Sequence, residues 1–206
     1  MLDRWANAAL QPALQAGARA LSRAGLGADA VTLAGFAIGM AAAAAIAMQA
    51  YSAGLVLLLA SRLADGLDGP LARLHGATDR GAFLDITLDF LFYASIPLAF
   101  AIADPAANAL PAAVLLAAFI GTGSSFLAFA VFAERRGLPA SAAPPSKGLY
   151  YLGGLTEATE TLTCFVLMCL WPAHFAWWAY GFAALCALTI ATRVVGGAMA
   201  LKEIKS

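Results

Sequence analysis

Charged side chains are scarce in this chain of 206 residues: Asp, Glu, Lys and Arg together make up 12% of it. In a soluble globular domain roughly one quarter of the residues are charged. Apolar residues, in contrast, make up 62% of the chain and gather in long runs. The shortage of charge excludes an ordinary soluble domain and indicates a membrane protein.

Two further absences narrow the possible functions. Neither sign of charge is in excess, because 12 basic residues balance 12 acidic ones. A protein that binds nucleic acid usually carries a basic face, so we expect no nucleic-acid partner. Cysteine is rare, and Cys164, Cys169 and Cys186 lie inside apolar runs without a CxxC pair. We interpret these three as small buried hydrophobic residues.

The first 28 residues lack the compact apolar core and cleavage site of a signal peptide. Their apolar side chains recur at helical spacing, with arginines between them. This pattern is typical of an amphipathic helix that lies along a membrane surface. The prediction rests on Leu2, Trp5, Ala9, Leu10, Leu14 and Leu21, together with Arg4, Arg19 and Arg23.

A helix that crosses a bilayer needs about 20 mostly apolar residues. Six segments meet this requirement, and prolines lie in the short connections, as is common at helix ends. Their approximate bounds are 31–50, 52–73, 81–103, 110–133, 151–170 and 175–201. The sequence therefore predicts an all-α integral membrane protein with a single domain over 1–206. Residues 1–28 form its surface helix and residues 29–201 its bundle of six transmembrane helices.

Among the connections between these spans, Lys and Arg occur only in alternate ones. They precede the first span, flank the turn between the second and third, enter the polar loop after the fourth, and follow the last. The residues are Arg4, Arg19, Arg23, Arg73, Arg80, Arg135, Arg136, Lys147, Lys202 and Lys205. Because cytoplasmic loops are enriched in Lys and Arg, we expect both termini in the cytoplasm.

Four carboxylates lie around the turn between the second and third spans. Asp65 and Asp68 are three residues apart, and Asp85 and Asp89 are four apart, so each pair shares one face of its helix. A tight turn brings the two faces together, where four carboxylates would repel one another or take up protons. Hard oxygen ligands suit Mg²⁺, Mn²⁺ or Ca²⁺. We therefore predict a divalent-metal site, and two ions about 3.5–4 Å apart would suit displacement at phosphorus.

The residues beside the carboxylates suit a diphosphate. Gly69 and Gly81 have no side chain, so a ligand can approach the backbone there. Arg73 can pair with phosphate oxygens through two parallel hydrogen bonds. These features favour a diphosphate held through metal at the cytoplasmic surface.

One pattern in this chain resembles the signature of the CDP-alcohol phosphotransferases. It reads Asp65-x2-Asp68-Gly69-x2-Ala72-Arg73-x7-Gly81-x3-Asp85-x3-Asp89. The interval before Gly81 is often one residue longer in relatives, and it falls in the turn. The resemblance implies an integral membrane enzyme, a transferase of substituted phosphate groups and usually a homodimer. Such an enzyme joins a CDP-linked donor, such as CDP-diacylglycerol, to an alcohol and releases CMP.

The resemblance also implies a role for each matching residue. Asp65, Asp68 and Asp85 would bind Mg²⁺ or Mn²⁺. Asp89 would complete a second metal site and act as the general base for the acceptor hydroxyl. The CDP site would be lined by Asp65, Gly69, Ala72, Arg73 and Gly81, joined upstream by Asp29 and Thr32.

The assignment of Asp29 and Thr32 rests on position. Relatives often show a Pro-Asn-x-x-Thr run near the nucleotide, and this chain has Ala28 and Asp29 in place of the Pro and the Asn.

We expect a single displacement, because the sequence offers no persuasive covalent nucleophile. His75 falls in the predicted turn and His174 at the opposite membrane face, so we interpret both as ordinary loop residues. Asp89 would take the acceptor's proton while the acceptor oxygen attacks the phosphorus on the lipid side.

The acceptor alcohol is open, and glycerol 3-phosphate leads on the breadth of the family alone. An amino alcohol, serine or an inositol-type alcohol are the alternatives. Glu157 and Glu160 resemble the Glu-x-x-Glu frame of the inositol-phosphate branch, but Ala158 and Thr161 stand where that branch has arginines. Both glutamates could instead meet an ammonium group, or pair with a basic residue. The candidate acceptor-binding residues are Arg135, Lys147, Glu157, Glu160 and Arg193.

Two non-enzymatic functions compete with this hypothesis. A divalent-cation transporter would need polar groups through the outer halves of the helices, where almost none occur. A membrane scaffold would use the aspartates as structural contacts, although unpaired carboxylates are poor contacts. The compact, alanine-rich chain suggests a bacterial plasma membrane, with the site facing the cytoplasm.

Overall fold

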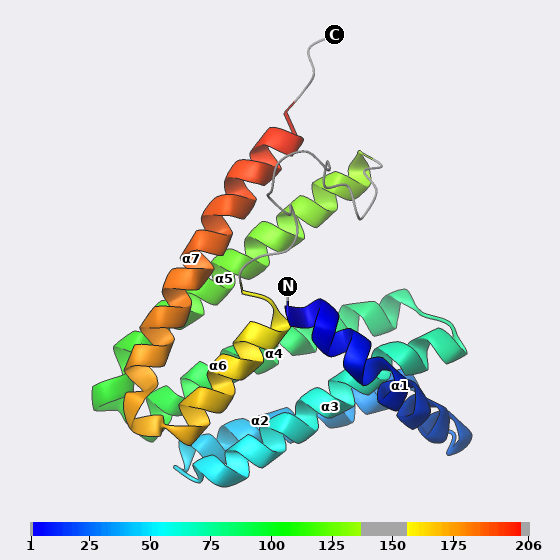
Figure 1. Cartoon of the computed structure of the whole chain (residues 1–206), viewed down its shortest axis with the longest axis horizontal. Helices are drawn as coiled ribbons and strands as arrows, with labels where there is room; N and C mark the ends of the chain where they lie inside the picture. Colours follow the sequence, from blue (N-terminus) through cyan, green and yellow to red (C-terminus); the bar gives the residue numbers. More distant parts are fainter. Residues whose placement is uncertain (1, 137–155, 203–206) are drawn as a thin grey trace.

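The computed structural model describes residues 2–136 and 156–202, and side chains from residue 11 onward within these ranges. The described part of the chain is helical and contains no strand (Figure 1). Its helices are α1 (Leu2–Arg23), α2 (Ala28–Ala47), α3 (Tyr51–His75), α4 (Asp79–Ala103), α5 (Pro105–Arg135), α6 (Ala158–Leu170), the 3₁₀ turn η1 (Pro172–His174) and α7 (Phe175–Ala200). The all-α prediction is confirmed.

Within the described residues, four helices are long and apolar enough to cross a membrane: Ala28–Ala47, Asp79–Ala103, Pro105–Arg135 and Pro172–Ala200. They correspond to the first, third, fourth and sixth spans expected from the sequence. The second expected span is α3, which has the length but carries Arg62, Asp65 and Asp68 among its apolar residues. The number of six spans and the cytoplasmic location of both termini therefore stay predictions.

The fifth expected span, 151–170, is also absent from the four helices that could cross a membrane. Its described part is α6, whose 13 residues are fewer than the about 20 that a span needs. Residues 151–155 of that segment lie outside the described ranges.

Glycines bring α2 and α3 close together. A Cβ at Gly35 would lie 3.0 Å from the Cβ of Ala64, and one at Gly39 would lie 2.9 Å from Ser61 Oγ. Small residues four apart are the usual means by which two membrane helices approach closely. Ser61 Oγ also donates a hydrogen bond of 2.8 Å to the carbonyl of Gly35. This contact fixes the part of α3 that immediately precedes the acidic cluster.

Aromatic rings fill the space between α4, α6 and α7. Phe92 and Phe165 meet edge to face at 6.5 Å, and Phe100 stacks on Phe175 at 4.6 Å. All four rings are fully buried. Offset or edge-to-face pairs of this kind add to the stabilisation that burial supplies. They hold α4 and α6 in register beside the site.

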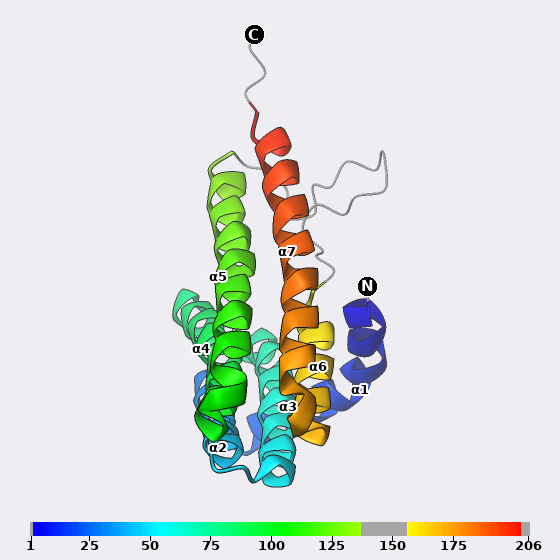
Figure 2. The same cartoon turned by 90° about the vertical axis from the view of Figure 1, so that its left-hand side faces the viewer.

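The helices α5 and α7 lie side by side and lean away from α2 and α3 (Figures 1 and 2). Gly121 and Gly197 of this pair face Ile190 and Phe129, so small residues again allow a close approach. At the other side of the molecule in Figure 1, α1 packs on α3, with Ala18 buried beside Leu71. The prediction of an N-terminal helix is confirmed, and its place on a membrane surface stays a prediction.

Candidate metal centre

A short turn brings the ends of α3 and α4 together. Gly76, which follows α3, has a φ of 92°, a conformation that glycine adopts without strain. Thr78 then caps α4, since its side-chain oxygen accepts a hydrogen bond of 3.1 Å from the N–H of Gly81. The chain reverses over three residues, so the carboxylates at the end of α3 face those at the start of α4. His75 is the last residue of α3, which corrects the expectation that it lies in the turn.

Three of the four predicted carboxylates converge. One oxygen each from Asp65, Asp68 and Asp85 lies within 4.8 Å of the other two. Divalent ions bind carboxylate oxygens at about 2.0–2.6 Å, so a single ion placed among the three could reach all of them. Asp68 is only 8% exposed. A buried carboxylate is costly unless a cation compensates its charge. The residues present therefore fit a divalent ion.

Thr32 of α2 holds the buried carboxylate in place. Its hydroxyl lies 2.9 Å from Asp68 Oδ2 and 3.0 Å from the carbonyl of Ala28, so it can donate to either. A hydroxyl that donates to a ligating carboxylate orients that ligand. The structure thus brings Thr32, expected near the site from the sequence, into direct contact with Asp68.

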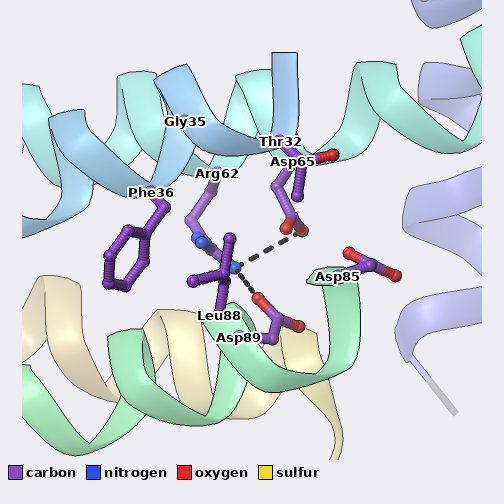
Figure 3. Close-up of a pocket in the computed structure, with 8 residues that line it drawn as sticks. All are labelled: Thr32, Gly35, Phe36, Arg62, Asp65, Asp85, Leu88 and Asp89. Atoms are coloured by element: carbon purple, nitrogen blue, oxygen red, sulfur yellow. Dashed lines mark hydrogen bonds and ion pairs between the residues drawn. The ribbon is translucent and has the colours of Figure 1, made fainter. Parts of the chain in front are cut away.

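Asp89 is not part of this group of three, and it contacts a basic residue. Arg62 Nη1 lies 2.6 Å from Asp89 Oδ1 and 3.3 Å from Asp65 Oδ2 (Figure 3). Figure 3 shows the guanidinium between the two carboxylates, with the Asp85 side chain pointing elsewhere. Two predicted metal ligands, Asp65 and Asp89, therefore contact the same cation of the protein, and the contact of Asp89 is the shorter one.

The sequence analysis did not identify Arg62 as part of the site. Its side chain is 10% exposed, and its Cζ lies 3.8 Å above the centre of the Phe92 ring and 5.6 Å from that of Tyr93. An arginine on a ring face gains a cation–π attraction. The sequence did contain a signal for Arg62, because it is a basic residue inside an apolar run. It lies three residues before Asp65 and thus on the same helix face.

The predicted CDP-binding residues lie around this cluster on three helices. Asp29 of α2 is 3.6 Å from Arg80 of α4, and a Cβ at Gly81 would lie 3.2 Å from Asp29 Oδ1. On α3, the nearest atom to a Cβ at Gly69 would be Arg73 Nη1, at 3.6 Å. Ala72 is half-buried beside them. A hollow beside the cluster is lined by Thr32, Gly35, Phe36, Arg62, Asp65, Asp85, Leu88 and Asp89 (Figure 3).

The predicted acceptor-binding glutamates have a structural role at the start of α6. Glu157 and Glu160 form a capping box, in which the carboxylate of Glu160 accepts a hydrogen bond of 3.2 Å from the N–H of Glu157. Glu157 also interacts electrostatically with Arg193 of α7, and Arg193 Nη1 donates to the carbonyl of Thr122 at 3.1 Å. The contacts of Arg193 with Glu157 and Thr122 therefore join α7 to the start of α6 and to α5.

Two acceptor candidates remain, Arg135 and Lys147. Arg135 is exposed at the end of α5, with its Cζ 5.9 Å from the centre of the Phe132 ring. Lys147 lies outside the described residues.

Comparison with known proteins gives consistent results. A family model described as CDP-alcohol phosphatidyltransferase matches residues 26–194. The inner membrane protein YnjF of Escherichia coli (strain K12) is 51% identical over 205 residues, covering 100% of this chain and 99% of that protein.

Solved structures of the phosphatidylinositol phosphate synthase PgsA1 of Mycobacterium tuberculosis share the fold. The one with CDP-DAG bound has a TM-score of 0.68 at 23% identity, over 94% of this chain and 98% of that one. The complex with manganese and citrate has a TM-score of 0.65 at 24% identity, over 89% and 88%.

Proposed function

This chain belongs to the CDP-alcohol phosphatidyltransferase family, and from that membership we propose the reaction that it catalyses. It moves a phosphatidyl or related phospho-alcohol group from a CDP-linked donor, such as CDP-diacylglycerol, to the hydroxyl of an alcohol. CMP is the other product. The CDP-DAG bound to the Mycobacterium tuberculosis relative supports a lipid-linked donor.

The observation that carries this proposal is the convergence of Asp65, Asp68 and Asp85 within 4.8 Å where α3 and α4 meet. The three carboxylates would hold Mg²⁺ or Mn²⁺, and the manganese complex of the relative supports that choice. A divalent ion bound there would neutralise the donor diphosphate and stabilise the charge that develops on the CMP leaving group.

The residues of the chain then bind and orient the donor. Arg73, exposed beside Gly69, would pair with diphosphate oxygens. Thr32 would keep Asp68 oriented, and Gly81 and Ala72 would leave space for the nucleotide. Asp29, 3.6 Å from Arg80, would complete the CDP site between α2 and α4.

The transfer is a single displacement. The acceptor oxygen forms a bond to the phosphorus on the lipid side, and the bond from that phosphorus to the CMP oxygen breaks with its electron pair going to CMP. Asp89 takes the proton of the acceptor hydroxyl. Its Oδ1 faces Arg62, which would fix the direction of the carboxylate and leave Oδ2 for the proton.

Glycerol 3-phosphate is the acceptor that we propose first, with an amino alcohol, serine or an inositol-type alcohol as alternatives. Arg193 is the basic residue best supported for the acceptor site, because it lies half-buried with Glu157 nearby. Arg135, Lys147 and Glu160 are further candidates.

The wider organisation follows the family. We propose that residues 1–206 act as one membrane domain, that two copies form a homodimer, and that the site faces the cytoplasm of a bacterial inner membrane. The name of the Escherichia coli relative supports this membrane.

The decisive experiment is an assay of CMP release. Purified protein in detergent receives labelled CDP-diacylglycerol, Mg²⁺ or Mn²⁺, and each alcohol in turn from a panel. We expect release with one acceptor, and its loss with a chelator. If no alcohol gives metal-dependent release, the scaffold hypothesis gains and the enzyme proposal fails.

Asp89→Asn tests the base within the same assay. We expect the rate of CMP release to fall by about 100- to 10,000-fold, the range typical of a lost general base. Donor binding, measured separately, should stay close to that of the unchanged protein. Undiminished release from Asp89→Asn would refute the assignment of the base.

A further inference from the structure

We propose that Arg62 takes the place of a second divalent ion, so that the acidic cluster of this chain binds one divalent ion, at Asp65, Asp68 and Asp85. The inference rests on the proposed function and deepens it. The family resemblance implies two ions, with Asp89 completing the second site. The difference comes from a cation that the protein itself supplies.

The position of the guanidinium carries the inference. A single nitrogen, Arg62 Nη1, lies 2.6 Å from Asp89 Oδ1 and 3.3 Å from Asp65 Oδ2. A second metal ion would have to bind between these same two carboxylates, at about 2.0–2.2 Å from each oxygen if it were Mg²⁺ or Mn²⁺. The nitrogen therefore occupies the volume that the second ion needs (Figure 3).

Arg62 is anchored where it lies. Its side chain is 10% exposed, and its Cζ lies 3.8 Å from the centre of the Phe92 ring, which is fully buried. A second hydrogen bond of 3.4 Å runs from Arg62 Nη2 to Ser61 Oγ, whose own position is fixed by Gly35. Moving the guanidinium away would leave a charge in an apolar setting without a partner, which is strongly unfavourable.

Charge opposes sharing of the site. Arginine keeps its proton at all accessible pH values, so Arg62 cannot become neutral to admit an ion. An ion between Asp65 and Asp89 would lie within a few ångströms of the guanidinium, and two cations so close in a partly buried site repel strongly. By contrast, Asp68 and Asp85 make no ion pair with Arg62 in the described part of the structure, and with Asp65 they remain able to hold one ion.

Counting bound ions tests the inference without any turnover. Purified protein in detergent is titrated with Mn²⁺, and free Mn²⁺ is measured by electron paramagnetic resonance. We expect one ion per chain for the unchanged protein and two for Arg62→Met, which keeps the apolar stem on Phe92 and removes the charge. Arg62→Lys, which keeps a cation near Asp89, should bind one. Two ions in the unchanged protein, or one ion in Arg62→Met, would overturn the inference.

Arg23→Met is the matched control, because Arg23 is an exposed arginine of α1 and its loss removes the same charge far along the chain. We expect it to bind one ion. A gain of an ion in this control would mean that overall charge, rather than the contact with Asp65 and Asp89, sets the count.

Asp89→Asn provides a second test that does not require Arg62→Met to fold. If Arg62 fills the second position, the count for Asp89→Asn stays at one ion. A fall from two ions to one would show that Asp89 binds metal and would overturn the inference. The assay of CMP release remains independent of the ion count. If the protein binds two ions and still releases CMP, only the role of Arg62 is refuted. If it binds one ion and releases no CMP, only the proposed function is refuted.

Discussion

At the scale of single residues, Thr32 shows how a metal ligand depends on its neighbour. Asp68 is buried, and the hydroxyl of Thr32 lies 2.9 Å from its Oδ2. We expect Thr32→Val, which keeps the shape and removes the donor, to weaken Mn²⁺ binding by about 10- to 100-fold, as is typical when a partner of a ligand is lost. Titration of the purified variants with Mn²⁺ measures this.

Thr32→Ser is the matched control, since it retains the hydroxyl and loses only a methyl group. Its affinity for Mn²⁺ should stay within a few-fold of that of the unchanged protein. Equal weakening in the Ser and Val variants would assign the effect to packing of the methyl group rather than to the hydrogen bond.

At the scale of helices, the contact of α2 with α3 and α4 positions Arg62. A Cβ at Gly39 would lie 2.6 Å from a ring carbon of Phe92, the ring that carries the guanidinium. Gly39→Ala should therefore destabilise the fold by about 1–3 kcal/mol, the usual effect of overpacking. Thermal unfolding in detergent, followed by circular dichroism, provides the measurement.

Gly181→Ala makes the same chemical change in α7, at a position where a Cβ would meet no atom within 4 Å. We expect it to be neutral or to stabilise the helix by up to about 1 kcal/mol, since alanine is the better helix former. If both variants lost the same stability, the close packing around Gly39 would not be the cause.

The start of α6 separates a structural from a binding role for Glu160. Glu160→Gln keeps the capping box, because a glutamine can also accept from the N–H of Glu157. Glu160→Ala removes the acceptor and should cost about 0.5–2 kcal/mol of stability. Thermal unfolding of the two variants measures this difference.

Enzyme kinetics then tests whether Glu160 also binds the acceptor. If Glu160 only caps the helix, Glu160→Gln will have an unchanged KM for the acceptor. A large rise in KM with unchanged stability would instead place the carboxylate in the acceptor site.

At the scale of the whole molecule, the orientation in the membrane can be tested with introduced cysteines. Ala77 is exposed in the turn between α3 and α4, and Ala106 is exposed in the first turn of α5, which follows the opposite end of α4. If the acidic cluster faces the cytoplasm, a membrane-impermeant maleimide should label Ala77→Cys only in inside-out vesicles. Ala106→Cys should be labelled only in right-side-out vesicles.

The native cysteines give little background in this experiment, because Cys164, Cys169 and Cys186 are buried. The native cysteines therefore do not have to be replaced before the experiment, and the unchanged protein is the control. Labelling of Ala77→Cys from the outside would reverse the predicted topology.

Composition and residue spacing were enough to predict the class of the protein and most of the residues of its site. Uninterrupted apolar runs of about 20 residues predict membrane helices, in which every backbone polar group is hydrogen-bonded within its own segment, and the described chain is helical. The period of the helix also places Asp65 with Asp68, and Asp85 with Asp89, on shared faces, because spacing within one helix is a local property. The family pattern added Thr32, which does contact Asp68.

Which charged side chains contact one another could not be predicted from the sequence, because it depends on how the helices pack. Arg62 and Asp89 are 27 residues apart on two helices, so their contact depends on how α3 and α4 pack, and on the ring of Phe92 beneath them. The same holds for Asp29 with Arg80, and for Glu157 with Arg193. The carboxylate of Glu160, in contrast, makes a local contact: it accepts a hydrogen bond from the N–H of Glu157 at the start of α6. Contacts between helices arise from the relative rotation and depth of whole packed elements, which residue spacing along the chain does not specify.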